Sequence, residues 1–254
     1  MPRRRADQLM VERALAESRA RAQALILAGR VFSGERRVGK PGDLLTPDAP
    51  LALRGQDHPW VSRGGIKLAQ GLAHFGLSPA GRRCLDIGAS TGGFTDVLLQ
   101  SGAAHVTAVD VGHGQLAWKL RTDPRVTVLE RTNARYLTPQ DVAGPVEALV
   151  CDASFIGLRT VLPAPLALCD PDAWAVALIK PQFEVGPAAV GKGGVVRDPR
   201  LHAATCETIE AWWTALPGWR VLGLTPSPIE GPDGNREFLI GARQEPDRSR
   251  PLPT

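Results

Sequence analysis

Hydrophobic and polar positions follow different patterns in the two parts of the chain. Residues 6–29 predict two short helices, each with apolar side chains on one side, and the second helix ends at Gly29. Short strand-like segments and turns continue to residue 53. From Trp60 onward, apolar stretches of strand length alternate with amphipathic helical stretches. This alternation is typical of a mainly parallel sheet with helices on both faces.

The second part contains seven apolar segments that we expect to be strands, and we therefore predict an α/β fold of the Rossmann-like kind. The segments are 83–87, 105–110, 126–130, 148–152, 173–180, 220–225 and 237–241. The small part before them is predicted as α+β. The expected boundaries are a basic module at 1–55, a linker at 56–60, the α/β domain at 61–243 and a polar, proline-rich, disordered tail at 244–254.

The excess positive charge of the chain lies in its first part. The chain has 30 Lys and Arg against 26 Asp and Glu, a net charge of +4. Residues 1–60 hold eleven basic and seven acidic residues, and the remaining chain holds nineteen of each. Ser18 is a predicted N-cap, and Arg19, Arg21 and Gln23 follow on the polar side of that helix. This distribution favours a polyanion-binding module on a neutral body, with an ordinary solvated helical face as the alternative.

Composition excludes several classes of protein. With 43% hydrophobic and 22% charged residues, the chain has enough apolar material for a core, which excludes wholesale disorder, a collagen-like fibre and a coiled coil. No apolar run approaches the roughly 20 residues of a membrane-spanning helix. The amino terminus is basic but has no apolar stretch behind it, so we expect no secretory signal.

The cysteines and histidines do not have the spacing of metal ligands. The four cysteines lie far apart and suit neither a zinc site nor a disulfide framework, so we expect a reducing cytoplasm. The five histidines also lack ligand spacing, and we expect no metal. The oligomeric state stays open. These cysteines and histidines are Cys84, Cys151, Cys169, Cys206, His58, His74, His105, His113 and His202.

A glycine-rich turn follows the first predicted strand of the α/β domain. Its spacing is G-x-x-x-G-G rather than the G-x-G-x-x-G of dinucleotide sites, and Asp86 precedes Gly88 by two residues. An acid at this place does not suit a pyrophosphate, but it suits the positively charged amino-acid portion of S-adenosylmethionine. Asp110, at the end of the next strand, is placed to accept hydrogen bonds from ribose hydroxyls. We therefore favour S-adenosylmethionine over a nicotinamide cofactor, and a tight turn without a ligand is the remaining alternative.

Four charged residues lie at strand ends or beside a glycine turn. Lysine is scarce, with five residues against twenty-five arginines, so a lysine in an apolar or glycine-rich setting suggests chemistry that arginine cannot perform. Lys180 and Asp152 end predicted strands, where active-site groups of such folds are found. Lys67 follows Ser-Arg-Gly-Gly-Ile, and Glu237 begins the last strand. Each residue alone could be a surface ion pair, but the four together favour an active site.

The first part resembles the small RNA-binding domain named for a ribosomal small-subunit protein. The resemblance covers residues 3–55 and rests on R-A-D at 5–7, S-R-A-R-A at 18–22, G-R-V at 29–31 and K-P-G-D at 40–43. It implies contacts that are mainly to phosphate. The expected RNA-binding residues of the chain are Arg4, Arg5, Arg19, Arg21, Gln23, Arg30, Lys40 and Arg63.

Six segments of the second part together resemble the TlyA (haemolysin A) family. They are WVSRGGIKL, LDIGASTGGFTDVLL, AVDVGHGQLAWKLR, CDASFI, LIKPQFEVG and GNREFL. The family consists of RNA 2′-O-methyltransferases with an FtsJ-like catalytic domain, so the resemblance implies a class I methyltransferase fold and cytidine in ribosomal RNA as the target. The family's catalytic tetrad corresponds to Lys67, Asp152, Lys180 and Glu237. The implied S-adenosylmethionine contacts are Asp86, Gly88, Ala89, Ser90, Thr91, Gly92, Gly93, Phe94, Asp110, Val111, Asn133 and Asp152.

The implied reaction requires a ribose hydroxyl to be aligned and deprotonated. Lys180 is the residue that we expect to orient the hydroxyl, and to accept its proton it must be neutral. Partial burial and the charge of Lys67 favour the neutral form, whereas Asp152 and Glu237 oppose it. If Lys180 stays charged, it instead stabilises the developing alkoxide. Trp60, Phe155 and Phe183 are either core residues or rings that stack on an extruded base.

Three other functions are weighed against this one. A nicotinamide-dependent oxidoreductase is disfavoured by the glycine spacing. A membrane-active haemolysin would need a long apolar or amphipathic helix, which the sequence does not show. An RNA-binding protein that has the fold without catalysis is disfavoured by the complete tetrad.

Overall fold

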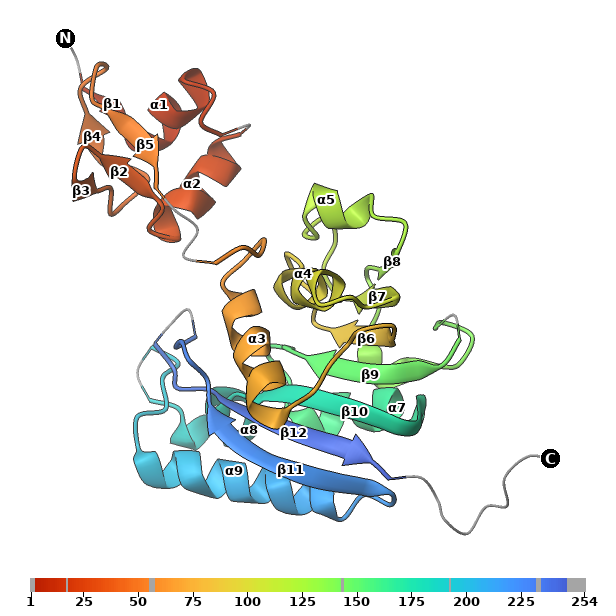
Figure 1. Cartoon of the computed structure of the whole chain (residues 1–254). Coiled ribbons are helices and arrows are strands. Elements are labelled where there is room, and N and C mark those ends of the chain that lie inside the picture. Colours follow the sequence, from red (N-terminus) through yellow and green to blue (C-terminus); the bar gives the residue numbers. More distant parts are fainter. Residues whose placement is uncertain are drawn as a thin grey trace. The chain divides into compact units, whose positions relative to one another are not determined.

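The computed structural model describes residues 3–16, 18–54, 58–142, 144–191, 193–231 and 234–245 (Figure 1). The chain forms two compact units, Met1–Pro59 and Trp60–Thr254. Trp60, which we expected in the linker, therefore belongs to the second unit. Residues 55–57 of the expected linker and residues 246–254 of the expected tail lie outside the described residues.

In its described residues, the N-terminal unit contains two helices and five very short strands. The predicted helices form, and the Ser18 hydroxyl accepts a hydrogen bond from the backbone N–H of Arg21, as expected of an N-cap. Apolar side chains of both helices pack with Val31 and Val38 in a small core. The elements are β1 (Arg4–Arg5), α1 (Ala6–Glu12), α2 (Arg19–Leu27), β2 (Val31–Ser33), β3 (Arg36–Arg37), β4 (Leu44–Leu45) and β5 (Leu51–Leu53). Strand β1 pairs with β4, and a second sheet has the order β3-β2-β5.

The second unit is built on a seven-stranded sheet with the order β11-β12-β10-β9-β6-β7-β8. The neighbouring strands β10, β9, β6, β7 and β8 pair in parallel, and β12 is antiparallel to both β10 and β11, so β12 alone of the seven runs in the opposite direction. All seven predicted strands are present, which confirms the mainly parallel α/β fold. Their bounds are β6 (Arg83–Ile87), β7 (His105–Val109), β8 (Val126–Leu129), β9 (Val146–Cys151), β10 (Cys169–Ile179), β11 (Trp219–Pro226) and β12 (Phe238–Gln244).

The last strand, β12, extends one residue into the expected tail at 244–254. Gln244 still belongs to β12, because it pairs with Trp219 of β11. The backbone N–H of Glu245 also donates to the carbonyl of Gly218. Gln244 is polar and only partly buried, so the sequence gives no apolar signal for the end of this strand.

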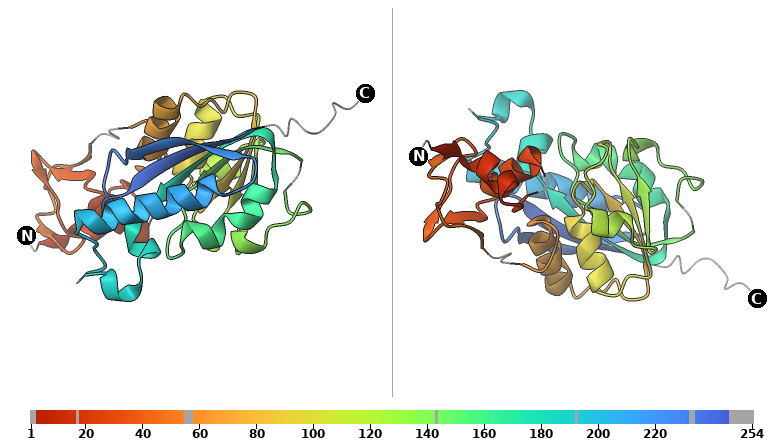
Figure 2. Two further views of the ribbon diagram at one scale, coloured as in Figure 1. Left: turned by 90° about the horizontal axis from the view of Figure 1, so that it is seen from below. Right: turned by 90° about the horizontal axis from the view of Figure 1, so that it is seen from above.

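Helices cover both faces of this sheet, as Figure 2 shows for α3 and α4 on one face and α9 on the other. Along β10 the side chains alternate between the two layers: Val176 and Leu178 pack with α3 and α4, and Ala177 and Ile179 pack with α6, α7 and α9. The helices are α3 (Gly64–Phe75), α4 (Gly93–Gln100), α5 (Trp118–Arg121), α6 (Leu158–Val161), α7 (Pro163–Ala167), α8 (Pro181–Glu184) and α9 (Pro199–Thr214), with 3-10 turns at η1 (Ala134–Tyr136) and η2 (Pro187–Ala189).

Candidate active site

Three of the four predicted catalytic residues follow or precede neighbouring strands at one edge of the sheet. Lys180 follows β10, and Asp152 follows β9, which pairs with β10 in parallel. Glu237 precedes β12, and the antiparallel register Ile179↔Phe238 continues to place Lys180 opposite Glu237. The topology therefore brings together residues that are far apart in the sequence.

Lys180 is buried and is held by oxygen atoms. Its Nζ atom lies 2.6 Å from Oδ1 of Asp152 and donates to the Asp152 carbonyl at 3.1 Å and to the Ser154 hydroxyl at 2.8 Å. Only 7% of the Lys180 side chain is exposed. Three oxygen partners around one nitrogen fit an ammonium group.

Lys67 forms the second ion pair of the site. Its Nζ atom donates to Oε2 of Glu237 at 2.6 Å, and both side chains are almost fully buried. Lys67 lies in the first turns of α3, which packs against β12 and β10. A buried charge is stable only when it is paired, so each residue of this pair depends on the other.

Glycines in the turn after β6, at 88–93, allow this turn to approach the segments that contain Asp152 and Lys67 closely. A Cβ atom on Gly88 would lie 2.8 Å from the backbone of Ala153, the residue after Asp152. A Cβ atom on Gly93 would lie 3.0 Å from the backbone N of Gly65, which belongs to α3 like Lys67. The absence of a side chain at Gly88 and Gly93 therefore allows the turn to pack against the segment after β9 and against the start of α3, and it also leaves room for a ligand.

Asp86 is a buried acid at the end of β6. It is fully buried, and Thr95 Oγ1 donates to its Oδ2 at 2.6 Å. Its other oxygen is buried without a hydrogen-bond partner among the described residues. Burial raises the pKa of Asp86 to about 7, although the Thr95 hydrogen bond opposes this. An orphaned buried carboxylate oxygen fits an incoming ammonium group, such as the one on the methionine part of S-adenosylmethionine.

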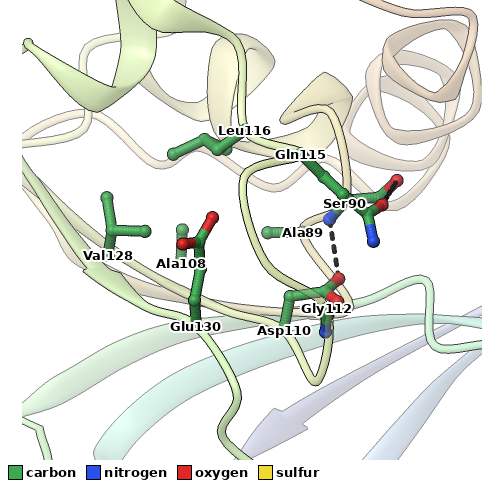
Figure 3. A pocket seen from close by; sticks show the side chains of 9 residues that line it. All are labelled: Ala89, Ser90, Ala108, Asp110, Gly112, Gln115, Leu116, Val128 and Glu130. Atoms are coloured by element: carbon green, nitrogen blue, oxygen red, sulfur yellow. Dashed lines mark hydrogen bonds between the residues drawn. The ribbon is translucent and has the colours of Figure 1, made fainter.

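A narrow pocket adjoins the glycine turn, and Figure 3 shows its lining side chains. Asp110 accepts hydrogen bonds from the backbone N–H groups of Ser90 at 2.8 Å and Gly112 at 2.7 Å, which fixes its carboxylate at the pocket. A second acid, two uncharged polar side chains and several apolar groups form the rest of the wall, a combination that fits a nucleoside. The lining residues are Ala89, Ser90, Ala108, Asp110, Gly112, Gln115, Leu116, Val128 and Glu130.

The remaining predicted cofactor residues occupy other positions. Asn133 does not line this pocket; its side chain accepts from the backbone N–H of Arg135 and caps η1. Val111 is 70% exposed and is also absent from the lining. Glu130, directly after β8, lines the pocket instead, and we gave it no role from the sequence. Its place at a strand end was the signal that could have identified it.

Comparison with known proteins identifies the families of both parts of the chain. Residues 60–244 match the FtsJ-like methyltransferase model, and residues 4–50 match the S4 domain model. The chain is 50% identical, over 97% of its length and 92% of the relative's, to the 16S/23S rRNA (cytidine-2′-O)-methyltransferase TlyA of Mycobacterium tuberculosis. The chain belongs to the TlyA family.

Two further TlyA-like proteins cover most of the chain. YqxC of Bacillus subtilis is 50% identical over 93% of this chain and 84% of the relative. A solved structure from Streptococcus thermophilus that is named as a hemolysin has a TM-score of 0.76 and 42% identity, covering 100% of this chain and 93% of that one. The family resemblance found in the sequence is thus confirmed, together with the two kinds of domain.

In this TlyA family member, several predicted RNA-binding residues surround one buried acid. Asp7 is fully buried and accepts hydrogen bonds from Arg5 at 3.0 Å, Gln23 at 2.9 Å and Arg19 at 3.2 Å. The hydrogen bond from Arg5 is the main reason that the pKa of Asp7 lies well below its ordinary range. About half of each arginine side chain stays exposed, 43% for Arg5 and 55% for Arg19, so both are fixed and still accessible.

The other predicted RNA-binding residues are not part of this cluster. Arg4 pairs with Glu12 at 2.5 Å, and Arg30 is partly buried. Arg63 is exposed at the N-terminus of α3, in the second unit. Arg21 and Lys40 are exposed in the first unit.

The described residues show neither a metal site nor a membrane span. Among them, no group of three or more His, Cys, Asp or Glu side chains could hold a metal ion. No described helix combines the length and the apolar character needed to cross a bilayer. Burial raises the pKa of the Cys84 and Cys151 thiols to about 12, which makes them poor nucleophiles.

Proposed function

We propose that this chain is an S-adenosylmethionine-dependent methyltransferase that modifies the ribose 2′-hydroxyl of cytidine in ribosomal RNA. The observation that carries the proposal is the presence of two ion pairs at the sheet edge, Lys180–Asp152 and Lys67–Glu237, in which both lysines and Glu237 are buried and Asp152 is partly exposed. The TlyA relative that is named for this reaction is 50% identical over nearly the whole chain. Since ribosomal RNA is the proposed substrate, we expect the enzyme to act in the cytoplasm.

The cofactor would be held by the turn after β6 and the pocket beside it. Asp86 would bind the ammonium group of the methionine part, Asp110 the ribose hydroxyls, and Glu130 with Val128 and Leu116 the adenine. When bound, S-adenosylmethionine supplies an electrophilic methyl group. The backbone of residues 88–93 would form the wall nearest to this cofactor.

Lys180 is proposed to orient the substrate hydroxyl. Its ammonium group is fixed by Asp152 and Ser154, so it can donate a hydrogen bond to the hydroxyl oxygen and stabilise the charge that develops there. The alternative role, general base, requires Lys180 to lose a proton despite these oxygen partners. In either role Asp152 positions the amine.

Lys67 and Glu237 are proposed to complete the electrostatic environment. Their buried ion pair places a second fixed positive charge near the hydroxyl and a carboxylate that limits its movement. Because both side chains are almost fully buried, their charges are screened by solvent and salt less than charges at the surface.

Phe155 is proposed to stack on the target base. Its ring is 90% exposed, which excludes a core role, and it lies three residues after Asp152. It contacts Phe183, whose centroid is 5.1 Å away and whose ring lies 6.0 Å from Nζ of Lys180. Phe155 also has a φ of 65°, a conformation that is costly for an aromatic residue and is found at functional sites. An exposed ring beside the catalytic lysine suits an extruded cytosine.

Mass mapping of ribosomal RNA tests the function. The RNA is incubated with the protein and isotopically labelled S-adenosylmethionine, and a Lys180→Ala variant serves as the control. We expect a labelled methyl group on a cytidine ribose that is absent with the variant. Cofactor binding without any ribose methylation on free RNA or on either ribosomal subunit would contradict the proposed target. Absence of cofactor binding would contradict the assignment of Asp86 and its turn.

A further inference from the structure

Asn235 joins two loops at the catalytic edge of the second unit. It is buried, with 2% of its surface exposed, and both the oxygen and the nitrogen of its side-chain amide form hydrogen bonds. Its Oδ1 accepts from the backbone N–H of Val196 at 3.0 Å, and its Nδ2 donates to the carbonyl of Gly194 at 2.9 Å. One side chain thus fastens the loop after α8 to the loop between β11 and β12.

Both loops are continuous with catalytic residues. The first follows α8, which begins directly after Lys180, and the second ends at Glu237. The backbone of the second loop closes on itself, since the N–H of Gly231 donates to the carbonyl of Asn235 at 2.9 Å. Gly231 also covers Glu237 so closely that a Cβ atom there would lie 2.6 Å from its carboxylate. Asn235 therefore fixes the segment that lies against Glu237.

The first loop has a second anchor on α9. His202 is buried, and its Nε2 lies 2.8 Å from the carbonyl of Val196. Val196 is thus held through its N–H by Asn235 and through its carbonyl by His202. Within the same loop, Gly193 and Gly194 have φ values of 80° and 78°, a conformation that glycine adopts readily. The loop also has backbone hydrogen bonds of its own, from Gly191 to Val195 and from Gly194 to Gly191, and the side chains of Asn235 and His202 attach it to the rest of the unit.

Each anchored residue is followed by an exposed arginine. Arg197 comes after Val196, and Arg236 comes after Asn235. Neither arginine forms an ion pair with any residue that the structure describes. Of the described acids beside them, Asp198 accepts from the backbone N–H of Arg200 and caps α9, whereas Glu230 is exposed near Gly234.

We propose that these two loops form an RNA-contacting surface, in which Arg197 and Arg236 bind phosphates and Asn235 is the positioning residue. The inference rests on the proposed function, because it assumes an RNA substrate at this site. Arginine suits the role, since its planar guanidinium can donate two hydrogen bonds to one phosphate. All residues of this surface belong to the second unit of the chain. The surface would bind the RNA next to the target nucleotide and so contribute to the affinity for the RNA substrate.

Charge variants test the phosphate contacts. Binding to 16S and 23S ribosomal RNA transcripts is measured over a range of salt concentrations for Arg197→Gln, Arg236→Gln and Glu230→Gln. We expect each arginine variant to bind about three- to tenfold more weakly and to lower the magnitude of the salt slope by roughly 0.7 to 0.9, as for one lost phosphate contact. Removing the negative charge of Glu230 should strengthen binding. Unchanged affinity and slope in both arginine variants would overturn the proposed surface.

Asn235→Ala tests the positioning role. We expect its KM for RNA to rise about tenfold while kcat changes less than threefold and the affinity for S-adenosylhomocysteine stays unchanged. Hydrogen exchange should become faster in the peptide that contains Val196, which reports the loss of the anchor directly. Gln140→Ala removes an exposed amide in the turn at 138–141 and is the matched control, with no change expected.

Further outcomes separate the inference from the proposed function. A fall in kcat with an unchanged KM would show that Asn235 acts on Glu237 rather than on RNA, and would overturn the inference alone. A lower Tm together with weaker cofactor binding would indicate general destabilisation and would also contradict it. If the wild-type chain methylates no ribosomal RNA, the proposed function fails. The loops are then judged by RNA affinity, and full retention of affinity in the arginine variants overturns the inference as well.

Discussion

Thr95 donates a 2.6 Å hydrogen bond to one carboxylate oxygen of Asp86, and the other oxygen is buried with no partner among the described residues. This arrangement is unfavourable for the isolated protein, because a buried carboxylate with one unused oxygen loses the hydration of its charge. It becomes favourable when a cation binds. We therefore expect Asp86 to strengthen cofactor binding and, in the absence of cofactor, to destabilise the fold.

Replacing Asp86 with asparagine should stabilise the protein at alkaline pH and remove cofactor binding. Burial raises the pKa of Asp86 from 3.8 to about 7, so the folded chain retains a proton that the unfolded chain releases between these values. The contribution of protonated Asp86 to the free energy of unfolding is therefore fully present below about pH 4 and is lost as the pH rises through about 7. We expect Asp86→Asn to raise Tm at pH 8 by roughly 2–4 °C, to change it little at pH 4, and to weaken S-adenosylhomocysteine binding more than tenfold.

Thermal unfolding at both pH values and calorimetric titration check this prediction. An equal effect of the substitution on Tm at pH 4 and pH 8 would contradict the raised pKa. Retained affinity would contradict the assigned contact to the cofactor.

Gly88→Ala should disrupt the junction between the cofactor turn and the catalytic segment. The added Cβ atom would lie 2.8 Å from the backbone of Ala153, which cannot move as a flexible side chain would. Gly76→Ala is the matched control, because Gly76 has a similar positive φ, 62° against 79°, and no atom within 4 Å of the added Cβ. We expect Gly88→Ala to cost about 1–3 kcal/mol more than the control in the free energy of unfolding, which denaturant titration measures. Equal losses in the two variants would show that backbone conformation, and not crowding, is what Gly88 provides.

Lys180→Arg should distinguish the two roles of Lys180. The Nζ atom is held by Asp152 and Ser154, an arrangement that suits a permanent positive charge. We therefore expect Lys180→Arg to keep on the order of a tenth of wild-type kcat, whereas Lys180→Ala should lose about 10²- to 10³-fold. Single-turnover methylation at saturating RNA measures both. Near-complete loss in Lys180→Arg, with cofactor affinity retained, would assign the role of general base to Lys180.

The sequence predicted the residues of the site that lie at strand ends. The apolar strand patterns placed Asp86, Asp110, Asp152 and Lys180 at one edge, because parallel strands end on the same side of a sheet. Lys67 lies beside a glycine turn and Glu237 at the start of the last strand, so this rule does not apply to them, and the family resemblance supplied the catalytic roles of all four tetrad residues.

Other contacts could not be predicted because they depend on tertiary packing. The bond between Asn235 and Val196 joins loops that no local pattern relates. The two-residue strands β1 and β4 are too short for an alternation of polar and apolar positions to be recognised. Glu130 directly follows β8, so the rule that predicts Asp110 at the end of the preceding strand also applies to Glu130.

Asp7→Asn should loosen the N-terminal unit and weaken RNA binding. The hydrogen bond from Arg5 and those from Gln23 and Arg19 keep the pKa of Asp7 well below its ordinary value, against the effect of burial. Because the folded-state pKa is lowered, the stabilising effect is present above about pH 4, the ordinary range of Asp, and is lost as the pH falls below it. The variant should therefore exchange amide hydrogens faster than the wild type in peptides from residues 1–59 at pH 7, and the difference should shrink on acidification.

The RNA affinity of Asp7→Asn should fall about three- to tenfold, because Arg5 and Arg19 lose the carboxylate that orients them. Gln8→Ala, at an exposed position of the same helix, is the control; if it matches Asp7→Asn in both measurements, the buried carboxylate has no special role.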